Sequence, residues 1–391
     1  MQNLINFEKA LKYNYLPAWQ NQLSTEPSPF LASIRKVPLT SSKIKATAPY
    51  GLSGGFGFGT EGGQTPKSGA VPFEGFEIDA KDMYCNIEIS NKAVHLTGDA
   101  GAMANALDTE VNAAYESAKW NVGRSLFGDG SGKLTAISAT TSSNIITVSN
   151  HKHCKEGLII DIYEDGSSVA KVSARRILSV ERNADGTGKI TIDGTAITCQ
   201  KGFITVQNSF GKEITGLGSI FDDKITKIYG VEKSASPYLK PTVIDCDGDI
   251  DDGLITSALR SAKQYKNSNV NLLMFGDKAF DAYLEYLRVN NIRNEKGDMS
   301  LNGGFKAINF TFSNTAVACV NESFVPDNEI WGVDTNVFEF HSFDWQFAEL
   351  QGGGIFNLME DSSAYRALLF NYGELICKNP GGCVRLLNCV A

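Results

Sequence analysis

The segment from residue 101 to residue 127 constrains the fold of this 391-residue chain more than any other. Its apolar residues recur at steps of three and four, at Met103, Leu107, Val111, Ala114, Ala118 and Val122. This spacing marks one face of an α-helix. Asp99 is a suitable N-cap, and Gly128 and Gly130 favour termination. The predicted helix is about 40 Å long at about 1.5 Å per residue, roughly twice the mean, so we expect it to span its domain.

Composition places the chain among globular proteins of two or three domains, with 42% hydrophobic and 20% charged residues. No apolar run approaches the eighteen residues of a membrane span, and the N-terminus lacks the pattern of a secretory signal. The eight cysteines form no CxxC pair, so we expect reduced thiols in a protein that folds in a cytoplasm. Cys377 and Cys383 flank an Asn-Pro-Gly-Gly turn and could face each other across a hairpin, also as thiols.

Charge is distributed unevenly along the chain. The net charge of −8 argues against a protein whose main task is to grip nucleic acid. Residues 1–50 nevertheless carry six cations against two carboxylates, which leaves this end basic and the remainder more acidic than the whole. A basic end on an acidic body suits an arm that lies across acidic neighbouring surfaces or faces DNA. A solvated tail without a partner is the alternative. Leu4, Phe7, Leu11 and Tyr15 predict a short helix within residues 1–22, which the sequence TEPSP ends.

Residues 51–63, GLSGGFGFGTEGG, contain seven glycines. A dinucleotide fingerprint needs GxGxxG between a strand and a helix, and a Walker A loop needs GK[ST]; neither pattern is present. The period-two alternation around Phe76, Ile78, Ile87 and Ile89 predicts strands. We therefore expect residues 51–92 to form one long β excursion with a glycine-rich tip. One interpretation is a flexible tip that can change its position on a neighbouring surface, with Phe56 and Phe58 as apolar anchors. The alternative is an exposed hairpin tip with no role.

Residues 134–210 contain about five short β-rich runs separated by Asp-Gly turns, which predicts a small barrel or sandwich inserted into a larger domain. From residue 250 the pattern is mixed α/β. Helices are predicted within 251–266 and 277–291, the second with Asp277 as its cap. Strand-like runs follow, and the chain ends with a helix or long strand and a hairpin.

The segment VIDCDGDIDDG concentrates five carboxylates, at Asp245, Asp247, Asp249, Asp251 and Asp252. An EF-hand would need Gly at its sixth position and Glu at its twelfth, where the chain has Ile250 and Thr256. The spacing partly resembles the nucleophile motif of haloacid dehalogenases and the calcium motif of nucleoside hydrolases. The simpler interpretation is an acidic loop in which Asp251 or Asp252 caps the following helix. Divalent-ion binding and hydrolysis through Asp245, Asp247, Asp251 and Asp252 remain the alternatives.

Other chemical motifs are sparse. His151, His153 and Cys154 lie close together, but the chain has only four histidines and no matching distant group. No GxSxG or HExxH pattern occurs. We therefore expect a protein that is not an enzyme, without catalytic, cofactor-binding or metal-binding residues and without a cofactor.

The order of these parts resembles the major capsid proteins of tailed bacteriophages, which have the Hong Kong 97-type capsid fold. The resemblance lies mainly in APYGLSGGFGFGTEGG, DMYCNIEISNKAVHL and AYESAKWNVGRSLFGDGSGKL, with GLGSIFDD further along. It implies an α+β chain with an N-arm, an extended β loop, a peripheral domain with a long spine helix, an axial domain and a small inserted β-barrel-like domain. The boundaries are 1–50 (N-arm), 51–92 (extended loop), 93–133, 211–240 and 366–391 (peripheral domain), 134–210 (insertion) and 241–365 (axial domain).

By the same resemblance the chain self-assembles as hexamers and pentamers into the icosahedral head that encloses the double-stranded DNA of a tailed phage. Assembly is expected in the host bacterial cytoplasm, and the mature location is the virion capsid. Partners would be other copies, a portal protein, the packaged DNA without sequence specificity, a scaffolding protein in trans and decoration proteins, with no membrane. The arm begins almost at Met1, so no removed segment is expected.

Inter-subunit contacts are expected from the loop and the arm. The loop residues are Gly54, Gly55, Phe56, Gly57, Phe58, Gly59 and Lys67, and the arm residues are Arg35, Lys36, Lys43 and Lys45. Glycine would let the tip change course over an adjacent subunit. An encapsulin-type compartment shell is the alternative within this fold. Encapsulins are shorter and begin with a helix rather than an arm.

Overall fold

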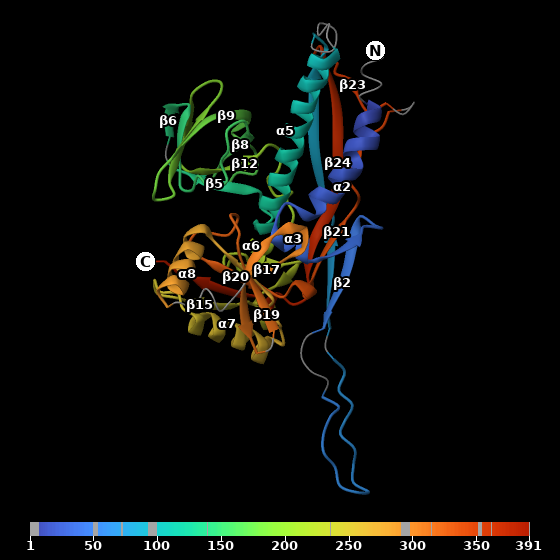
Figure 1. The fold of residues 1–391 in the computed structure, drawn as a ribbon, viewed down its shortest axis with the longest axis vertical. Helices are drawn as coiled ribbons and strands as arrows, with labels where there is room; N and C mark the ends of the chain where they lie inside the picture. Colours follow the sequence, from blue (N-terminus) through green and yellow to red (C-terminus); the bar gives the residue numbers. More distant parts are fainter. Residues whose placement is uncertain are drawn as a thin grey trace. The chain divides into compact units, whose positions relative to one another are not determined.

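The computed structural model describes residues 8–49, 54–71, 73–92, 100–138, 140–234, 236–290, 298–313, 315–350, 354–360 and 362–390. The chain divides into two compact units, which are coloured by sequence in Figure 1. Unit 1 comprises Met1–Gly123 and Ile220–Ala391, and unit 2 comprises Arg124–Ser219. As predicted, the chain is of the mixed α+β class. Within the described ranges, every helix is too short or too polar to cross a membrane.

The long helix is confirmed as α5 (Ala100–Phe127). Val111, Ala118 and Val122 of the predicted apolar stripe are buried, and Ala114 is partly buried. The helix ends at Phe127, directly before Gly128, and Gly130 has a φ of 81°, a conformation that glycine adopts without strain. Asp99 and the side chains of the stripe before Val111 lie outside the described residues.

The N-terminal region is helical and packs on α5. It consists of η1 (Leu11–Tyr15), α2 (Leu16–Thr25) and α3 (Pro29–Ser33). The predicted helix is confirmed from residue 8 onward and ends before Pro27, while Leu4 and Phe7 lie outside the described residues. Trp19 is buried, and its ring stacks on that of Tyr115 in α5 at a centroid distance of 5.5 Å. The Ser28 hydroxyl accepts a hydrogen bond from the Leu31 amide at 3.0 Å and so caps α3.

A six-stranded sheet in unit 1 is built around one long strand, β24. Its strands are β1 (Arg35–Pro38), β4 (Lys81–Ser90), β21 (Phe338–Ser342), β22 (Gln346–Phe347), β23 (Asn357–Leu358) and β24 (Ala364–Cys377). The order is β1-β21-β24-β22, and β4 and β23 also pair with β24. Only β1 and β21 run parallel. The Cys85 thiol of β4 lies 3.4 Å from the Ala114 carbonyl oxygen, which places α5 against this sheet.

The second sheet of unit 1 has seven strands in the order β15-β25-β20-β16-β19-β18-β17. These are β15 (Thr242–Asp245), β16 (Leu272–Phe275), β17 (Asp298–Ser300), β18 (Lys306–Phe312), β19 (Thr315–Asn321), β20 (Ile330–Val333) and β25 (Val384–Leu387). Helices α7 (Asp252–Lys266) and α8 (Asp277–Val289) share one hydrophobic core with it, in which Leu259 and Tyr283 pack with Phe275. Both predicted helices are confirmed. The cap of α8 is Gly276 rather than Asp277, because Asp277 already lies in the first turn.

The boundaries predicted for the C-terminal third do not follow the sheets. Strands β21 to β23 lie in the range assigned to the axial domain, yet they pair with β24. Strand β25 lies in the range assigned to the peripheral domain, yet it pairs with β15 and β20. The predicted terminal hairpin is therefore wrong, since β24 and β25 belong to different sheets. The turn η5 (Pro380–Gly382) connects them, and Cys377 and Cys383, which flank it, are both buried. All eight cysteines are free thiols.

Unit 2 contains a closed antiparallel barrel, one of the two architectures that the sequence left open. Its order is β10-β7-β5-β12-β8-β9. The strands are β5 (Lys133–Ile137), β7 (Ile145–Val148), β8 (Ile159–Glu164), β9 (Val172–Arg182), β10 (Gly188–Ile192) and β12 (Gly202–Val206). Isoleucine dominates its interior, where Ile146, Ile160 and Ile190 are fully buried. The three Asp-Gly turns have positive φ at glycine, as such turns require.

Short elements complete the two units. They are β6 (Thr140–Ser143) with β11 (Ile197–Cys199), β13 (Lys227–Ile228) with β14 (Val231–Glu232), α6 (Leu217–Phe221), η2 (Pro237–Leu239), η3 (Asn302–Gly304) and η4 (Thr335–Val337).

Candidate inter-subunit surfaces

The glycine-rich segment is the tip of a hairpin made by β2 (Lys43–Pro49) and β3 (Phe73–Asp79). The predicted excursion over 51–92 is therefore wrong in its limits. Its first strand is β2, which lies in the range assigned to the arm, while β4 pairs with β24 instead. Alternation alone could not distinguish these partners, because β3 and β4 both show a period of two. The base of the hairpin is anchored in unit 1, where buried Phe76 packs against Tyr229 at a ring-centroid distance of 5.3 Å.

Beyond β2 and β3 the two legs of the loop run side by side, as Figure 1 shows. A Cβ added to Gly69 would lie 2.7 Å from the Gly54 amide nitrogen, and one added to Gly57 would lie 2.9 Å from the Pro66 side chain. Glycine is therefore required where the legs approach each other, rather than along the whole run. The tip closes with a hydrogen bond of 2.9 Å from the Gly63 amide to the Thr60 carbonyl.

The tip exposes two phenylalanines. Residues 54–68, including Lys67, are all exposed. Phe56 is 82% exposed and Phe58 is 95% exposed, and their rings contact each other edge to face at a centroid distance of 5.4 Å. Burying an aromatic side chain against another surface contributes about 1.5–3 kcal/mol. The pair is therefore apolar surface that the described part of its own chain does not bury.

The predicted arm cations lie on two elements. Lys43 and Lys45 are on β2 and face Glu77, with the Lys43 Nζ 2.9 Å from its carboxylate. The hydrogen bond from Lys43 lowers the pKa of Glu77. Arg35 and Lys36 are on β1, in the six-stranded sheet. The structure thus places half of the arm residues on the same hairpin as the glycine tip and the other half apart from it.

Arg35 contacts a carboxylate of its own chain, Glu339, at 3.6 Å. Burial alone would raise the pKa of Glu339, but the hydrogen bond and charge of Lys378, 2.7 Å away, together with His341, lower it. Lys36 is half-buried, which lowers its pKa. Three of the four predicted arm cations are therefore compensated within the chain. That compensation weakens the expectation that the arm supplies free positive charge to a partner.

The carboxylates between β15 and α7 serve the local structure. Asp251 accepts a hydrogen bond from the Leu254 amide at 2.6 Å, which confirms the predicted helix cap. Asp252 accepts one from the Tyr283 hydroxyl at 3.1 Å, and Asp245 accepts one from the Asp247 amide at 3.1 Å. Asp247 and Asp249 are exposed. These bonds account for the positions of Asp245, Asp251 and Asp252 without an ion.

In the sequence cluster at residues 151–154, His151 and Cys154 contact different parts of unit 2. His151 Nδ1 lies 2.8 Å from the Gly186 carbonyl, and Cys154 is buried in the barrel core, where burial raises its pKa to about 12. Over the described ranges, no three His, Cys, Asp or Glu side chains gather as a metal site would require.

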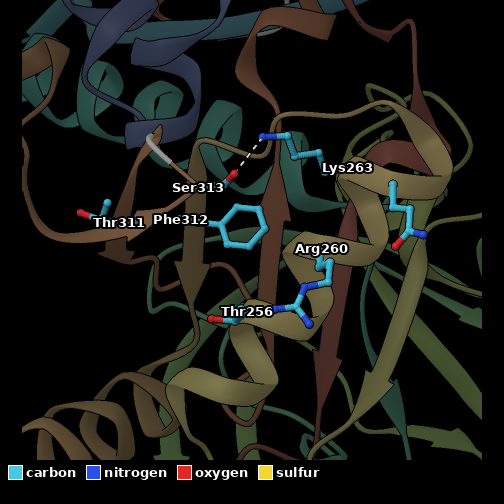
Figure 2. A pocket seen from close by; sticks show the side chains of 7 residues that line it. Thr256, Arg260, Lys263, Thr311, Phe312 and Ser313 are labelled. Carbon is cyan, nitrogen blue, oxygen red and sulfur yellow. Dashed lines mark hydrogen bonds between the residues drawn. The ribbon is translucent and has the colours of Figure 1, made fainter.

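A basic recess on α7, which Figure 2 shows, was not predicted from the sequence. It is an open cavity of about 630 Å³, lined by Thr256, Arg260, Lys263, Gln264, Thr311, Phe312 and Ser313. The first four residues lie on one face of α7, and the others lie at the end of β18 and in the turn after it. The spacing of Arg260 and Lys263 places two cations on one helix face. The sequence alone shows this pair of cations. It does not show the opposite wall of the recess, because residues 311–313 lie far along the chain from α7.

Comparison with known proteins identifies the fold. No family model and no curated protein matches the sequence. The fold is that of a bacteriophage capsid protein. In the capsid asymmetric unit of cyanophage A-1(L), the match covers 96% of this chain and 93% of that chain, with a TM-score of 0.53 and 11% identity.

Two further solved structures, both of protein shells, are similar to this chain with lower TM-scores. The capsid of a native GTA particle matches 93% of this chain and 91% of that chain, with a TM-score of 0.46 and 9% identity. The holo-SrpI encapsulin complex from Synechococcus elongatus matches 93% and 88%, with a TM-score of 0.44 and 9% identity. The fold assignment rests on the cyanophage match alone.

Proposed function

We propose that this chain is the major capsid protein of a tailed bacteriophage, which self-assembles as hexamers and pentamers into the icosahedral head around double-stranded DNA. The observation that carries the proposal is the fold match to a phage capsid over 96% of the chain. It covers both the long helix and the two sheets of unit 1, so it is a match of the whole chain rather than of one motif.

The exposed hairpin tip supports assembly with other copies. A solvated monomer gains nothing from two exposed phenylalanines on a narrow hairpin, whereas an adjacent copy can bury them. We assign Gly54, Gly55, Phe56, Gly57, Phe58, Gly59 and Lys67 to this inter-subunit contact. We assign Lys43 and Lys45, on β2 of the same hairpin, to the base of this contact, and Arg35 and Lys36, on β1, to a separate inter-subunit contact of the arm. In a closed shell each such contact is repeated by symmetry, so modest contacts become collectively stable.

In this proposal the six-stranded sheet with α5 forms the peripheral domain, the seven-stranded sheet forms the axial domain, and the barrel is the insertion. The protein is structural and not an enzyme. Its further partners are a portal protein, a scaffolding protein in trans, decoration proteins and the packaged DNA, bound without sequence specificity. It assembles in the host bacterial cytoplasm and resides in the virion capsid.

A compartment shell of the encapsulin type is the second candidate. One observation favours it: the described residues from position 8 through α2 are helical, and encapsulins begin with a helix rather than an arm. The contents of the particles separate the two candidates. Nuclease-protected DNA inside the particles supports the phage head, and a protein cargo without DNA supports the compartment.

Negative-stain electron microscopy with size-exclusion chromatography of the purified protein tests the proposal. We expect closed polyhedral shells, or hexamers and pentamers that build them. A monomer or simple dimer of 42.3 kDa chains, even with a scaffolding protein co-expressed, would contradict the proposal.

A further inference from the structure

The recess on α7 carries positive charge that no described residue of the chain neutralises with an ion pair. Arg260 is exposed and forms no ion pair within the described part of the chain. The Lys263 Nζ lies 3.4 Å from the Ser313 hydroxyl oxygen, drawn as a dashed line in Figure 2, and 5.9 Å from the centre of the Phe312 ring. A carboxylate in the recess would meet a guanidinium and an ammonium group, with the Thr256 hydroxyl on the same helix face and the Thr311 hydroxyl on the opposite wall.

The same chain exposes a matching group of carboxylates at the other end of α7. In the acidic loop (residues 245–250), exposed aspartates alternate with buried Cys246 and Ile250. Asp247 and Asp249 project from this loop and form no ion pair or side-chain hydrogen bond with any other described residue. A tight turn holds the loop, with a φ of 51° at Asp247 and 91° at Gly248. The loop therefore presents two uncompensated negative charges from a fixed position.

The acidic loop does not reach the recess of its own chain. Arg260 and Lys263 lie about 12 Å and 16 Å along α7 from its first residue, at about 1.5 Å per residue. Buried Cys246 and Ile250, together with the Asp251 cap, fix the loop at the beginning of the helix. Two complementary surfaces on one chain that cannot meet each other can meet on two copies. A contact between different surfaces of identical copies is heterologous, and it forms a ring where the rotation between successive copies closes.

We propose that the acidic loop of one copy docks into the Arg260–Lys263 recess of the next copy around each capsomer ring. The occupant is a second copy of this chain because the complementary charge is present on the chain itself. This inference rests on the proposed function, since it supplies a head-to-tail contact within hexamers and pentamers. Its chemistry is a set of charge-assisted hydrogen bonds from Arg260 and Lys263 to Asp247 and Asp249.

Charge reversal tests the contact. The double variant Arg260→Glu/Lys263→Glu and the double variant Asp247→Lys/Asp249→Lys each place like charges opposite each other. Each should lower the yield of capsomers or shells by at least about tenfold, because like-charge contacts across an interface cost several kcal/mol. The combined fourfold variant restores complementarity on every copy and should recover assembly.

A mixture of the two double variants gives a sharper result. Each copy of one variant can contact only copies of the other, so the two must alternate around a ring. Six copies can alternate and five cannot. The mixture should therefore form hexamers and flat or tubular arrays, without the pentamers that close a shell.

Matched controls carry the same charge changes on the barrel, in Lys189→Glu/Lys201→Glu and Asp165→Lys/Glu181→Lys, where the side chains are exposed. These should assemble as the wild type does. Thermal melting monitored by circular dichroism should be unchanged for all variants, which excludes misfolding.

Three outcomes would overturn the inference. Normal assembly of both double variants shows that the recess and loop do not meet. Failure of the folded fourfold variant shows that they meet other groups. Normal assembly with reduced DNA retention in Arg260→Glu/Lys263→Glu particles assigns the recess to phosphate instead. If the wild type itself does not assemble, the proposed function fails together with this inference; if it assembles and the reversals have no effect, only this inference fails.

Discussion

Arg124 and Glu213 form a buried, two-pronged ion pair within unit 2. Arg124 Nη1 lies 3.0 Å from Glu213 Oε2, and Nη2 lies 2.5 Å from Oε1. The side chains are 6% and 9% exposed. Arg124 is in the last turn of α5, where the chain enters unit 2, and Glu213 follows β12, where it leaves. The pair therefore ties the two ends of the barrel unit together.

Arg124→Ala should destabilise unit 2 by about 3–5 kcal/mol, because it leaves the Glu213 carboxylate buried without its partner. Arg182→Ala is the matched control, since its pair with Glu156 is about half exposed. It should cost less than about 1 kcal/mol. Hydrogen exchange of barrel peptides in increasing urea measures unit 2 separately. Equal effects of the two substitutions would contradict the prediction.

Stability should fall in alkaline solution because the buried thiol of Cys154 and the partly buried thiol of Cys85 resist ionisation. Burial raises the pKa of Cys85 to about 11 and that of Cys154 to about 12. An unfolded thiol titrates near 8.5. The unfolded chain therefore loses protons first, so this contribution is fully present below about pH 8.5 and is lost as pH rises through the folded pKa values.

The measurement is the melting temperature between pH 7 and pH 10.5. Each thiol costs up to about 1.4 kcal/mol per pH unit above its unfolded pKa. Cys85→Ser and Cys154→Ser should each reduce the slope, since serine does not titrate in this range. A slope that is the same in the wild type and both variants would exclude these thiols as the cause.

Phe56→Ser/Phe58→Ser should leave the monomer intact and impair assembly. Both side chains are almost fully exposed, so unfolding free energy should change by less than about 0.5 kcal/mol. Val169→Ser, at a residue 74% exposed on unit 2, is the control for removing an exposed apolar group. Urea unfolding and sedimentation of assembled particles give the two readouts. Particles formed with wild-type yield would remove the tip from the inter-subunit contact.

Gly69→Ala should separate the legs of the loop, whereas Gly75→Ala should not. A methyl group at Gly69 would lie 2.7 Å from backbone nitrogen, while one at Gly75 meets nothing within 4 Å. Gly75→Ala should be neutral or stabilise by about 0.4–1 kcal/mol, through the unfolded chain. Trypsin cleavage after exposed Lys67 reports on the loop before any assembly. It should accelerate in Gly69→Ala only, and unchanged cleavage would show that the legs accommodate the methyl group.

Local patterns predicted local structure well. The apolar stripe at Val111, Ala118 and Val122 fixes one buried helix face, and Asp-Gly turns at regular intervals favour short antiparallel strands. Both signals depend only on residues close in sequence, so they can be recognised without knowledge of the partner. The cap at Asp251 is of the same kind.

Long-range pairing could not be predicted in this way. Strand β2 pairs with β3 across the glycine-rich segment, and β25 inserts between β15 and β20. Alternation shows that a strand has a buried face but not which strand it pairs with. The recess on α7 was missed for the same reason, since Arg260 and Ser313 are remote in sequence and meet only through the seven-stranded sheet.

The ion pair between Arg124 and Glu213, where the chain enters and leaves unit 2, bears on whether this unit can be replaced. Gly216 allows the returning backbone to approach the end of α5 so closely that a Cβ there would lie 2.5 Å from the Leu126 carbonyl oxygen. A unit whose entry and exit are adjacent is a cassette: it can be lost, exchanged for another or used to display a foreign peptide without rerouting the rest of the chain.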